Sequence, residues 1–503
     1  MKRPNILLIT TDQQHWNTIG TFNNEISTPN LNRLAKEGTT FSRAYCPNPT
    51  CTPSRASIIT GMYPSQHGAW ALGTKLSEDV RTIGHELKDD GYQTALIGKA
   101  HFQPLKSNDT YSSLESYPIL QDLEFWRTFN GPFYGFDYVE LARNHTNEAH
   151  VGQHYALWME EKGCKNWRDY YLSPTGSMDQ SIQYKWQIPE EFHYNTWISE
   201  RSNTTLEKYK ENNESFFLWA SFFDPHPPYL VPEPWDTMYD PEKLTIPKVV
   251  PGEHDTNPPH FQLTQEVNPD FSEYVEEKFG NIGFHSHMNI SEEEAKQNMA
   301  VYYGMISMLD KYVGKILDKL DELGLSENTI VVFTTDHGHL FGQHGLHDKG
   351  GFHYEDLLRL PFIVRYPNRV PADRICPSMQ SLVDLAPTFL SFAGIPIPRT
   401  MTGVDQKEVW TGKNGMARDH VICEYRNQPT KVHQKTFIGE RYKITVYFNE
   451  TYGELFDLKE DPEEIRNVWN APEYREIREQ LLFHYIWAEL AKEPMSMPRI
   501  SGA

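Results

Sequence analysis

The sequence lacks a long apolar run, a disulfide-like cysteine pattern and any excess of basic residues. No apolar stretch approaches the ~20 residues that a membrane-spanning helix needs. The five cysteines, at positions 46, 51, 164, 376 and 423, show no spacing typical of a disulfide framework or a zinc cluster. The chain carries 68 acidic and 47 basic residues, a formal net charge of −21. That balance disfavours nucleic-acid binding and leaves room only for a local basic pocket. We therefore expect no membrane partner and no nucleic-acid partner.

The N-terminal segment MKRPNILLITTDQQ resembles a signal peptide only superficially. Its apolar run is short, it ends at Asp12, and no small-residue cleavage site follows. We interpret it as the first β-strand. With Met1 as the start, the sequence predicts a cytoplasmic protein, whereas an export signal upstream of Met1 would make it periplasmic or secreted.

Length and periodicity predict an α/β protein with one large and one small domain. The chain has 503 residues, more than a single core usually holds. Short β-rich runs alternate with helical patterns, which predicts a large, mixed, mostly parallel sheet sandwiched by helices. The predicted strands are 4–11, 92–98, 216–223, 328–335 and 361–366, and the clearest helices are 28–38 and 292–324.

We place the large domain at 1–400, with an aromatic-rich insert at about 105–215. Residues 401–503 form a small α+β subdomain in this prediction. Its antiparallel strands fall within 419–425, 435–448 and 453–458, and a helix over 473–493 closes it.

Polar side chains follow four of the predicted strands at the point where each strand ends. They are Asp12 and Gln13, Lys99 and His101, Asp224 and His226, and Asp336 and His337. In an open α/β sheet, ligands bind beyond the carboxyl ends of the strands. The pattern therefore predicts one polar site at that edge.

The residue types in this set divide between a cation and an anion. Asp12, Gln13, Asp336 and His337 are predicted metal ligands because their oxygen donors suit calcium or magnesium, and the imidazole leaves manganese or zinc open. A buried pair of carboxylates also repels itself unless a cation neutralises it. The cationic or proton-carrying groups suit an anionic substrate; they are Arg55, Lys99, His101, His226 and Lys349.

The segment CTPSR, residues 51–55, has a structural and a functional interpretation. It predicts a helix with Thr52 as N-cap and Pro53 at the first position, ending before Gly61. It could be a surface turn and nothing more. A helix N-terminus also directs free N–H groups at an anion, which would place Cys51 and Arg55 beside one.

Other notable residues favour structural roles. His339, His344, His347 and His353 are expected to be structural or solvated, and Cys164, Cys376 and Cys423 to be small buried hydrophobes. The aromatic residues of the insert mainly predict a core. Some of them, with His67 and Trp70, could instead form a wall that selects the alcohol part of a substrate.

Together these motifs resemble the type I, formylglycine-dependent sulfatases of the alkaline-phosphatase superfamily. The strongest element is Cys-x-Pro-Ser-Arg at 51–55, followed by ASIITGMYPSQHG. PNILLITTDQQ, GKAHF, FDPHPPY and TTDHGHLFGQHGLHDKGGFHYEDLLRLPFIVRYP also match in order. The resemblance covers most of the chain, although 105–215 and the last hundred residues match only in general shape. It implies an alkaline-phosphatase-like fold and a sulfuric ester hydrolase.

The resemblance also implies a role for each site residue. Cys51 would be oxidised to formylglycine by a maturing enzyme that acts on CTPSR. With Asp12, Gln13, Asp336 and His337 it would hold calcium. Arg55 would steady the formylglycine, Lys99 and Lys349 would clamp sulfate with His226 as a further candidate, and His101 or His226 would protonate the leaving alcohol.

Two departures from the family pattern bear on the substrate. Gln13 stands where many sulfatases have a second aspartate, and His337 where many have asparagine. Both variants resemble the branch that contains choline sulfatases and phosphonate monoester hydrolases. Lys99 and His101 favour sulfatases, because the resemblance implies that phosphonate hydrolases have uncharged residues at these two positions.

The predicted activity is hydrolysis of a sulfate ester of a small carbohydrate or a similar alcohol or aryl group. The alternatives are a phosphonate monoester hydrolase or phosphodiesterase with the same nucleophile, a choline-sulfatase-like activity, and a sulfated-ligand-binding protein in which Cys51 is never converted. A cysteine protease would leave Asp12 and Asp336 unexplained.

Overall fold

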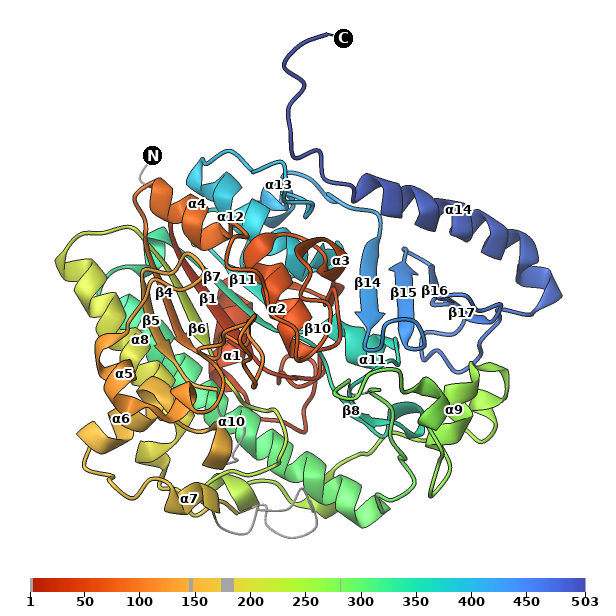
Figure 1. The fold of residues 1–503 in the computed structure, drawn as a ribbon, viewed down its shortest axis with the longest axis horizontal. Helices are drawn as coiled ribbons and strands as arrows, with labels where there is room; N and C mark the ends of the chain where they lie inside the picture. Colours follow the sequence, from red (N-terminus) through yellow and green to blue (C-terminus); the bar gives the residue numbers. More distant parts are fainter. Residues whose placement is uncertain (1–2, 144–147, 173–184, 281, 503) are drawn as a thin grey trace.

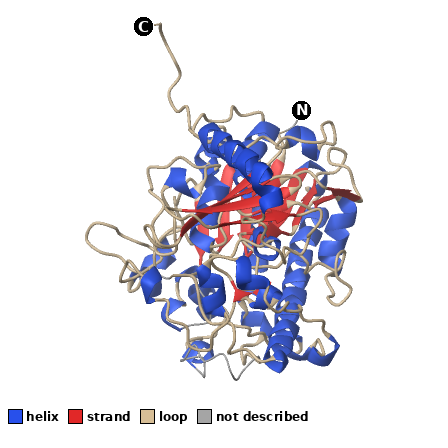
Figure 2. Cartoon of the chain, turned by 90° about the vertical axis from the view of Figure 1, so that its right-hand side faces the viewer, coloured by secondary structure: helices blue, strands red, loops and turns tan. Residues whose placement is uncertain are grey.

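A large sheet between two layers of helices forms most of the molecule, and a smaller sheet under one long helix forms the rest (Figure 1). The structure is a computed structural model that describes residues 3–143, 148–172, 185–280 and 282–502. Figure 2 shows the strands enclosed by helices on the outside.

The central sheet has eight strands in the order β12-β2-β11-β7-β1-β6-β4-β5. Its middle is parallel and consists of β7 (Thr329–Thr335), β1 (Asn5–Thr11), β6 (Phe216–Ser221) and β4 (Gln93–Gly98). Strand β5 (Tyr138–Leu141) extends it in parallel, while β11 (Phe362–Arg365) runs antiparallel to both β7 and β2 (Thr39–Phe41). The edge strand β12 (Arg374–Cys376) is parallel to β2. The predicted mixed, mostly parallel sheet is confirmed.

Both faces of this sheet are buried, which is why its strands are continuous apolar runs. Ile6 and Leu8 of β1 pack into one core with α2 (Cys51–Thr60), α4 (Ile83–Asp89) and α12 (Leu385–Ala393). Leu7 and Ile9 pack into the other core with α1 (Pro29–Glu37), α8 (Tyr194–Glu211) and α10 (Glu292–Glu322). Alternate side chains of β1 therefore pack against the two helix layers in turn.

The helix that carries the CTPSR motif begins earlier than predicted. Its N-cap is Thr50, in an extended conformation, so Cys51 is the first helical residue and the assignment of Thr52 as N-cap was wrong. The first four N–H groups of a helix have no partner within it, so Pro53 costs no hydrogen bond at the third position. The helix ends as predicted, with Gly61 in the left-handed conformation at φ 63°.

The C-terminal region is the predicted antiparallel sheet closed by a helix. Its four strands pair in sequence order and are β14 (Val421–Arg426), β15 (His433–Ile438), β16 (Tyr442–Tyr447) and β17 (Gly453–Asp457). Helix α14 (Arg475–Ala491) lies along this sheet and buries Leu481 and Ala488 against it (Figure 1).

The aromatic residues of the insert build core, as the structural interpretation predicted. Trp158, Trp167 and Trp197 are buried in one cluster with α8 and α10, and Trp126 lies in the opposite core. None of the helices that the structure describes is long and apolar enough to cross a bilayer.

The remaining elements are short. They are α3 (Pro64–His67), α5 (Leu123–Thr128), α6 (Gln153–Glu161), α7 (Asp169–Leu172), α9 (Pro259–Thr264), α11 (Glu355–Leu358), α13 (Lys407–Trp410), β3 (Ala44–Tyr45), β8 (Leu340–Phe341), β9 (His347–Asp348), β10 (Arg359–Leu360) and β13 (Gln380–Ser381).

Candidate active site

Side chains that follow the parallel strands meet the first turn of α2 at one edge of the sheet. Asp12 follows β1, Asp336 and His337 follow β7, and Cys51 opens α2. One ligand atom from each of these four residues lies within 4.8 Å of every other, and all four residues are buried. The folding of the chain thus gathers two carboxylates, an imidazole and a thiol around one point.

Three cations surround this point. Lys99, which follows β4, forms an ion pair with Asp12, and Arg55 donates from Nε to Asp336 Oδ2 at 2.7 Å. Lys349 Nζ lies 3.4 Å from Cys51 Sγ. Arg55 is fully buried whereas Lys349 is half-buried, so the side of Lys349 is where a substrate can approach.

The charges determine the protonation of the thiol and the carboxylates. Burial and Asp12 raise the pKa of Cys51, but Lys349, Lys99 and His337 outweigh them and lower it to about 6. Burial and the neighbouring Asp12 raise the pKa of Asp336. Burial also opposes ionisation of Asp12, yet the charge of Lys99 and the other cations holds its pKa well below the usual range.

Gln13 and His337 each have an acceptor atom that a cation could bind. Gln13 has a left-handed backbone, φ 62°, and its N–H donates to Asp336 Oδ1 at 3.1 Å. Its Oε1 is buried with no hydrogen-bond partner among the described residues, which fits an oxygen that a cation would bind. His337 Nδ1 lies 3.0 Å from the carbonyl oxygen of Gly338 and donates to it, so the lone pair on Nε2 faces the cluster.

The two candidate proton donors, His101 and His226, lie on different sides. His226 Nε2 is 3.0 Å from Lys349 Nζ, and its Nδ1 is 2.6 Å from the carbonyl oxygen of Pro227. Burial and Lys349 lower the pKa of His226 to about 3. His101 contacts Arg143 instead, and burial and Arg143 lower the pKa of His101 well below its ordinary value.

Several supporting residues were not predicted. Asp348 accepts a hydrogen bond from Gln13 Nε2, and His339 Nδ1 lies 2.8 Å from the same nitrogen. His339 is buried and also contacts the hydroxyl of Tyr229, so it is structural, as expected, and it orients Gln13. Arg143 and Glu115 come from the insert, where no motif marks them. Asp348 could have been found from its place beside Lys349.

His67 and Trp70 lie beyond α2, on the α3 turn. His67 is buried, and its Nε2 lies 3.0 Å from Ser57 Oγ. Trp70 is half-buried under the guanidinium of Arg426, 5.4 Å from the ring centroid. Their part in substrate selection stays a prediction.

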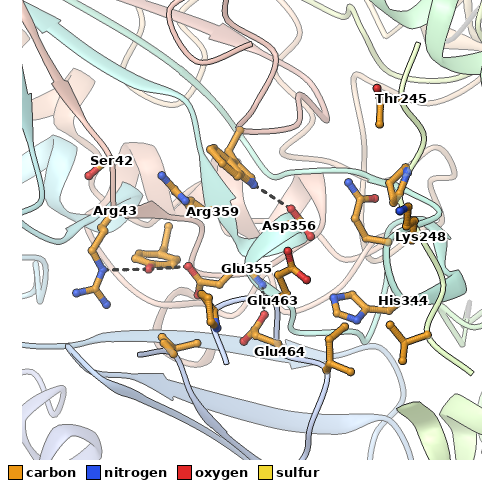
Figure 3. Close-up of a pocket in the computed structure, with 18 of the residues that line it drawn as sticks. Ser42, Arg43, Thr245, Lys248, His344, Glu355, Asp356, Arg359, Glu463 and Glu464 are labelled. Atoms are coloured by element: carbon orange, nitrogen blue, oxygen red, sulfur yellow. Dashed lines mark hydrogen bonds between the residues drawn. The ribbon is translucent and has the colours of Figure 1, made fainter. Parts of the chain in front are cut away.

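A cleft of about 870 Å³ lies between the large sheet and the C-terminal region (Figure 3). Its lining mixes Arg43 and Arg359 with Glu355 and Asp356, and none of the predicted site residues lines it. The indole of Trp16 donates to Asp356 within this cleft.

The fold and the gathered site define a hydrolase of the alkaline-phosphatase superfamily. Residues 4–395 match the model of the Sulfatase family, and 342–489 match the model of the C-terminal region of N-sulphoglucosamine sulphohydrolase. The first match covers most of the chain, so this protein belongs to the sulfatase family and is a sulfuric ester hydrolase.

Named relatives agree with this assignment. The chain is 29% identical over 484 residues to an arylsulfatase of Clostridium perfringens, covering 94% of this chain and 92% of the relative. It is 26% identical to an N-acetylglucosamine-6-O-sulfatase of Bacteroides thetaiotaomicron, covering 96% and 85%. The same fold is found in a phosphonate monoester hydrolase of Silicibacter pomeroyi, with a TM-score of 0.79, 22% identity and coverage of 98% and 96%.

Proposed function

We propose that this sulfatase hydrolyses the sulfate ester of a small carbohydrate or similar alcohol, using a formylglycine hydrate made from Cys51 and a bound calcium ion. The observation that carries the proposal is the position of Cys51. It opens a buried helix and lies among Asp12, Asp336, His337 and Lys349, within reach of both a cation and an anionic substrate.

The proposed aldehyde accounts for a cysteine at position 51. The cysteine is the precursor of the nucleophile, and its thiol is not the group that attacks sulfur. A thiolate that attacked sulfur would form a sulfur–sulfur adduct with no easy exit. One oxygen of an aldehyde hydrate can attack sulfur while the sulfur–alcohol oxygen bond breaks. Loss of the proton from the other hydrate oxygen then re-forms the aldehyde and expels sulfate, which divides one difficult step into two.

The residues present fit a hard divalent cation. Asp12, Asp336, the orphaned Oε1 of Gln13 and the Nε2 of His337 would hold it, together with the modified Cys51. Bound there, calcium would supply positive charge to the hydrate and to a sulfate oxygen. Magnesium or manganese would offer the same kind of charge at a smaller radius.

The cations of the chain would hold the sulfate group. Lys99 and Lys349 would bind sulfate oxygens as negative charge moves onto the leaving oxygen. Arg55 lies between the two carboxylates, 2.7 Å from Asp336 and 3.9 Å from Asp12, and would keep them in place for the cation.

The first test is the mass of the peptide that contains residue 51, from protein made with a formylglycine-generating enzyme. Conversion of the thiol to an aldehyde lowers the mass by about 18 Da. An intact thiol under these conditions would contradict the covalent mechanism. Cys51→Ala should abolish turnover of 4-nitrophenyl sulfate and leave the thermal midpoint unchanged, and turnover at the wild-type rate would refute the nucleophile.

The second test compares substrates. Gln13 and His337 leave a phosphodiesterase or phosphonate monoester hydrolase as the alternative, while Lys99 in the cluster favours sulfate. We expect kcat/KM for 4-nitrophenyl sulfate to exceed that for bis(4-nitrophenyl) phosphate. A strong preference for the diester would overturn the assignment of the physiological substrate.

A further inference from the structure

The side chain of Arg143 reaches His101 from the end of β5. Its NH2 group lies 2.6 Å from His101 Nε2, and its NH1 group donates to the carbonyl oxygen of Gln103 at 3.1 Å. Arg143 is 3% exposed and His101 is 6% exposed, so this contact is shielded from water. Burial lowers the pKa of Arg143, and the charges of Glu115 and Cys51 act in the opposite direction.

Glu115 holds both partners. Its carboxylate accepts hydrogen bonds from the N–H groups of His101 and Gln103, each at 2.8 Å, and lies 3.5 Å from Arg143 NH1. These bonds fix His101 in a left-handed conformation, φ 59°, which a residue with a side chain rarely adopts. The backbone and the ring of His101 are therefore both constrained.

The contact with Arg143 determines the tautomer of His101. A guanidinium has only donors, so the ring nitrogen beside it must accept. Nε2 of His101 then carries no hydrogen, and the single ring hydrogen is on Nδ1. Burial and the cations Arg143 and Lys99 also oppose protonation of the ring by lowering its pKa.

We propose that Arg143 is a positioning residue that keeps His101 neutral, with its hydrogen on Nδ1, so that His101 acts as a hydrogen-bond donor and does not carry the proton to the leaving alcohol. Neutral histidines serve as such donors in other enzymes. When the sulfur–oxygen bond breaks, its electron pair stays on the alcohol oxygen, and the proton released by the attacking hydrate oxygen reaches that alcohol oxygen by way of a group other than His101. This inference rests on the proposed function.

Replacing His101 tests which nitrogen matters. The side-chain amide of asparagine places an N–H close to the position of Nδ1, and that of glutamine places one close to Nε2. We expect H101N to keep kcat for 4-nitrophenyl sulfate within about tenfold of wild type and H101Q to lose about 100-fold or more. An active H101Q with an inactive H101N would overturn the proposal.

Replacing Arg143 tests the positioning role. R143Q should lower kcat by about 10- to 100-fold with KM within about threefold, as for other residues that orient a functional histidine, and R143K should recover part of the loss. The matched control is R201Q, because Arg201 also comes from the insert and its guanidinium pairs with the carboxylate of Glu140. The double variant R143Q/H101A should have a kcat only slightly lower than that of R143Q alone, because both changes remove the same interaction. Wild-type kcat in R143Q would overturn the inference.

The tautomer can also be measured without turnover. In NMR spectra of protein labelled with ¹⁵N-histidine, the ring signals of His101 can be identified because they disappear in H101N. They should show a hydrogen on Nδ1 and none on Nε2. A hydrogen on Nε2 would refute the inference even if the enzyme is a sulfatase. If the wild-type protein hydrolyses no sulfate ester while the expected tautomer is present, the proposed function fails and the tautomer assignment stands.

Discussion

Cys51 combines deep burial with a lowered thiol pKa. Burial alone would favour the neutral thiol, yet the positive charge of Lys349 and Lys99 is close enough to reverse the balance. The proposed cation site and the proposed sulfate site overlap at this residue, since its neighbours include both carboxylates and ammonium groups.

In unconverted, metal-free protein, the thiolate of Cys51 should form with a midpoint near pH 6, followed by ultraviolet absorbance near 240 nm. The thiol dominates below the midpoint and the thiolate above it. Lys349→Met should move the midpoint upwards because it removes a charge that lowers the pKa. Cys51→Ser should remove the step, because burial raises the pKa of Cys164 and of Cys423. A wild-type midpoint near 9 would contradict the electrostatic account.

Removal of the divalent cation should abolish sulfatase activity, and calcium should restore it. In Gln13→Ala the cluster loses its orphaned oxygen, so we expect at least about tenfold more calcium to be needed for half-maximal activity. The matched control is Gln14→Ala, since among the described residues the side chain of Gln14 bonds to Thr11 and Thr18. Activity that is unaffected by a strong chelator would exclude a metal role for these residues.

The ends of the strands set the positions of the site residues. At the end of β4, Gly98 lies very close to the backbone of β6. A Cβ at Gly98 would lie 1.9 Å from the carbonyl oxygen of Ser221 on β6, and the residue has φ 110°. Lys99 comes directly afterwards and donates its backbone N–H to the same oxygen at 3.0 Å. The close approach of β4 and β6 therefore also places Lys99.

Gly98→Ala should lower both the thermal midpoint and kcat, because β4 must move away from β6 and carry Lys99 with it. The left-handed backbone costs about 1–2 kcal/mol and the clash about 1–3 kcal/mol more. Gly91→Ala is the matched control, since Gly91 also has a positive φ but faces open space. Equal losses of stability in the two variants would show that backbone strain alone matters.

Long elements were predictable from the sequence, and contacts between distant segments were not. The five predicted strands are confirmed within two residues because burial on both faces produces continuous apolar runs. Strands β2, β3, β5 and β12 were missed, since two to four residues carry no period. Asp12 and Asp336 could be placed because parallel strands end at one edge. Arg143 and Glu115 could not, since only tertiary packing brings them to His101.

At the scale of the whole molecule, one buried carboxylate joins the large sheet layer to the C-terminal region. Glu424 of β14 accepts hydrogen bonds from the N–H and hydroxyl of Ser65, both at 2.8 Å, and pairs with Lys435 of β15 and with Lys492 beyond α14. Burial would raise the pKa of Glu424, but Lys492 and Lys435 lower it to about 2.

Glu424→Gln should destabilise the protein by roughly 3 kcal/mol at neutral pH, because the buried Lys492 and the partly buried Lys435 each lose one of the two carboxylates that pair with them. A pKa lower in the folded than in the unfolded chain stabilises the fold above about pH 4.3, and this contribution is lost as the pH falls towards 2. The difference in thermal midpoint between wild type and variant should therefore shrink from pH 6 to pH 3. The control is Glu489→Gln, whose side chain is 28% exposed and shares the same lysines. If the difference in thermal midpoint stayed the same between pH 6 and pH 3, the lowered pKa of Glu424 would not contribute to stability.

The burial of Cys51 has a consequence for the proposed conversion of its thiol. Its side chain is 1% exposed and the whole of α2 is buried under α12 and the central sheet. If a maturing enzyme oxidises this residue, it must reach CTPSR before α2 forms and docks. Conversion would then compete with folding, and a molecule that folds first would keep its thiol for as long as it stays folded.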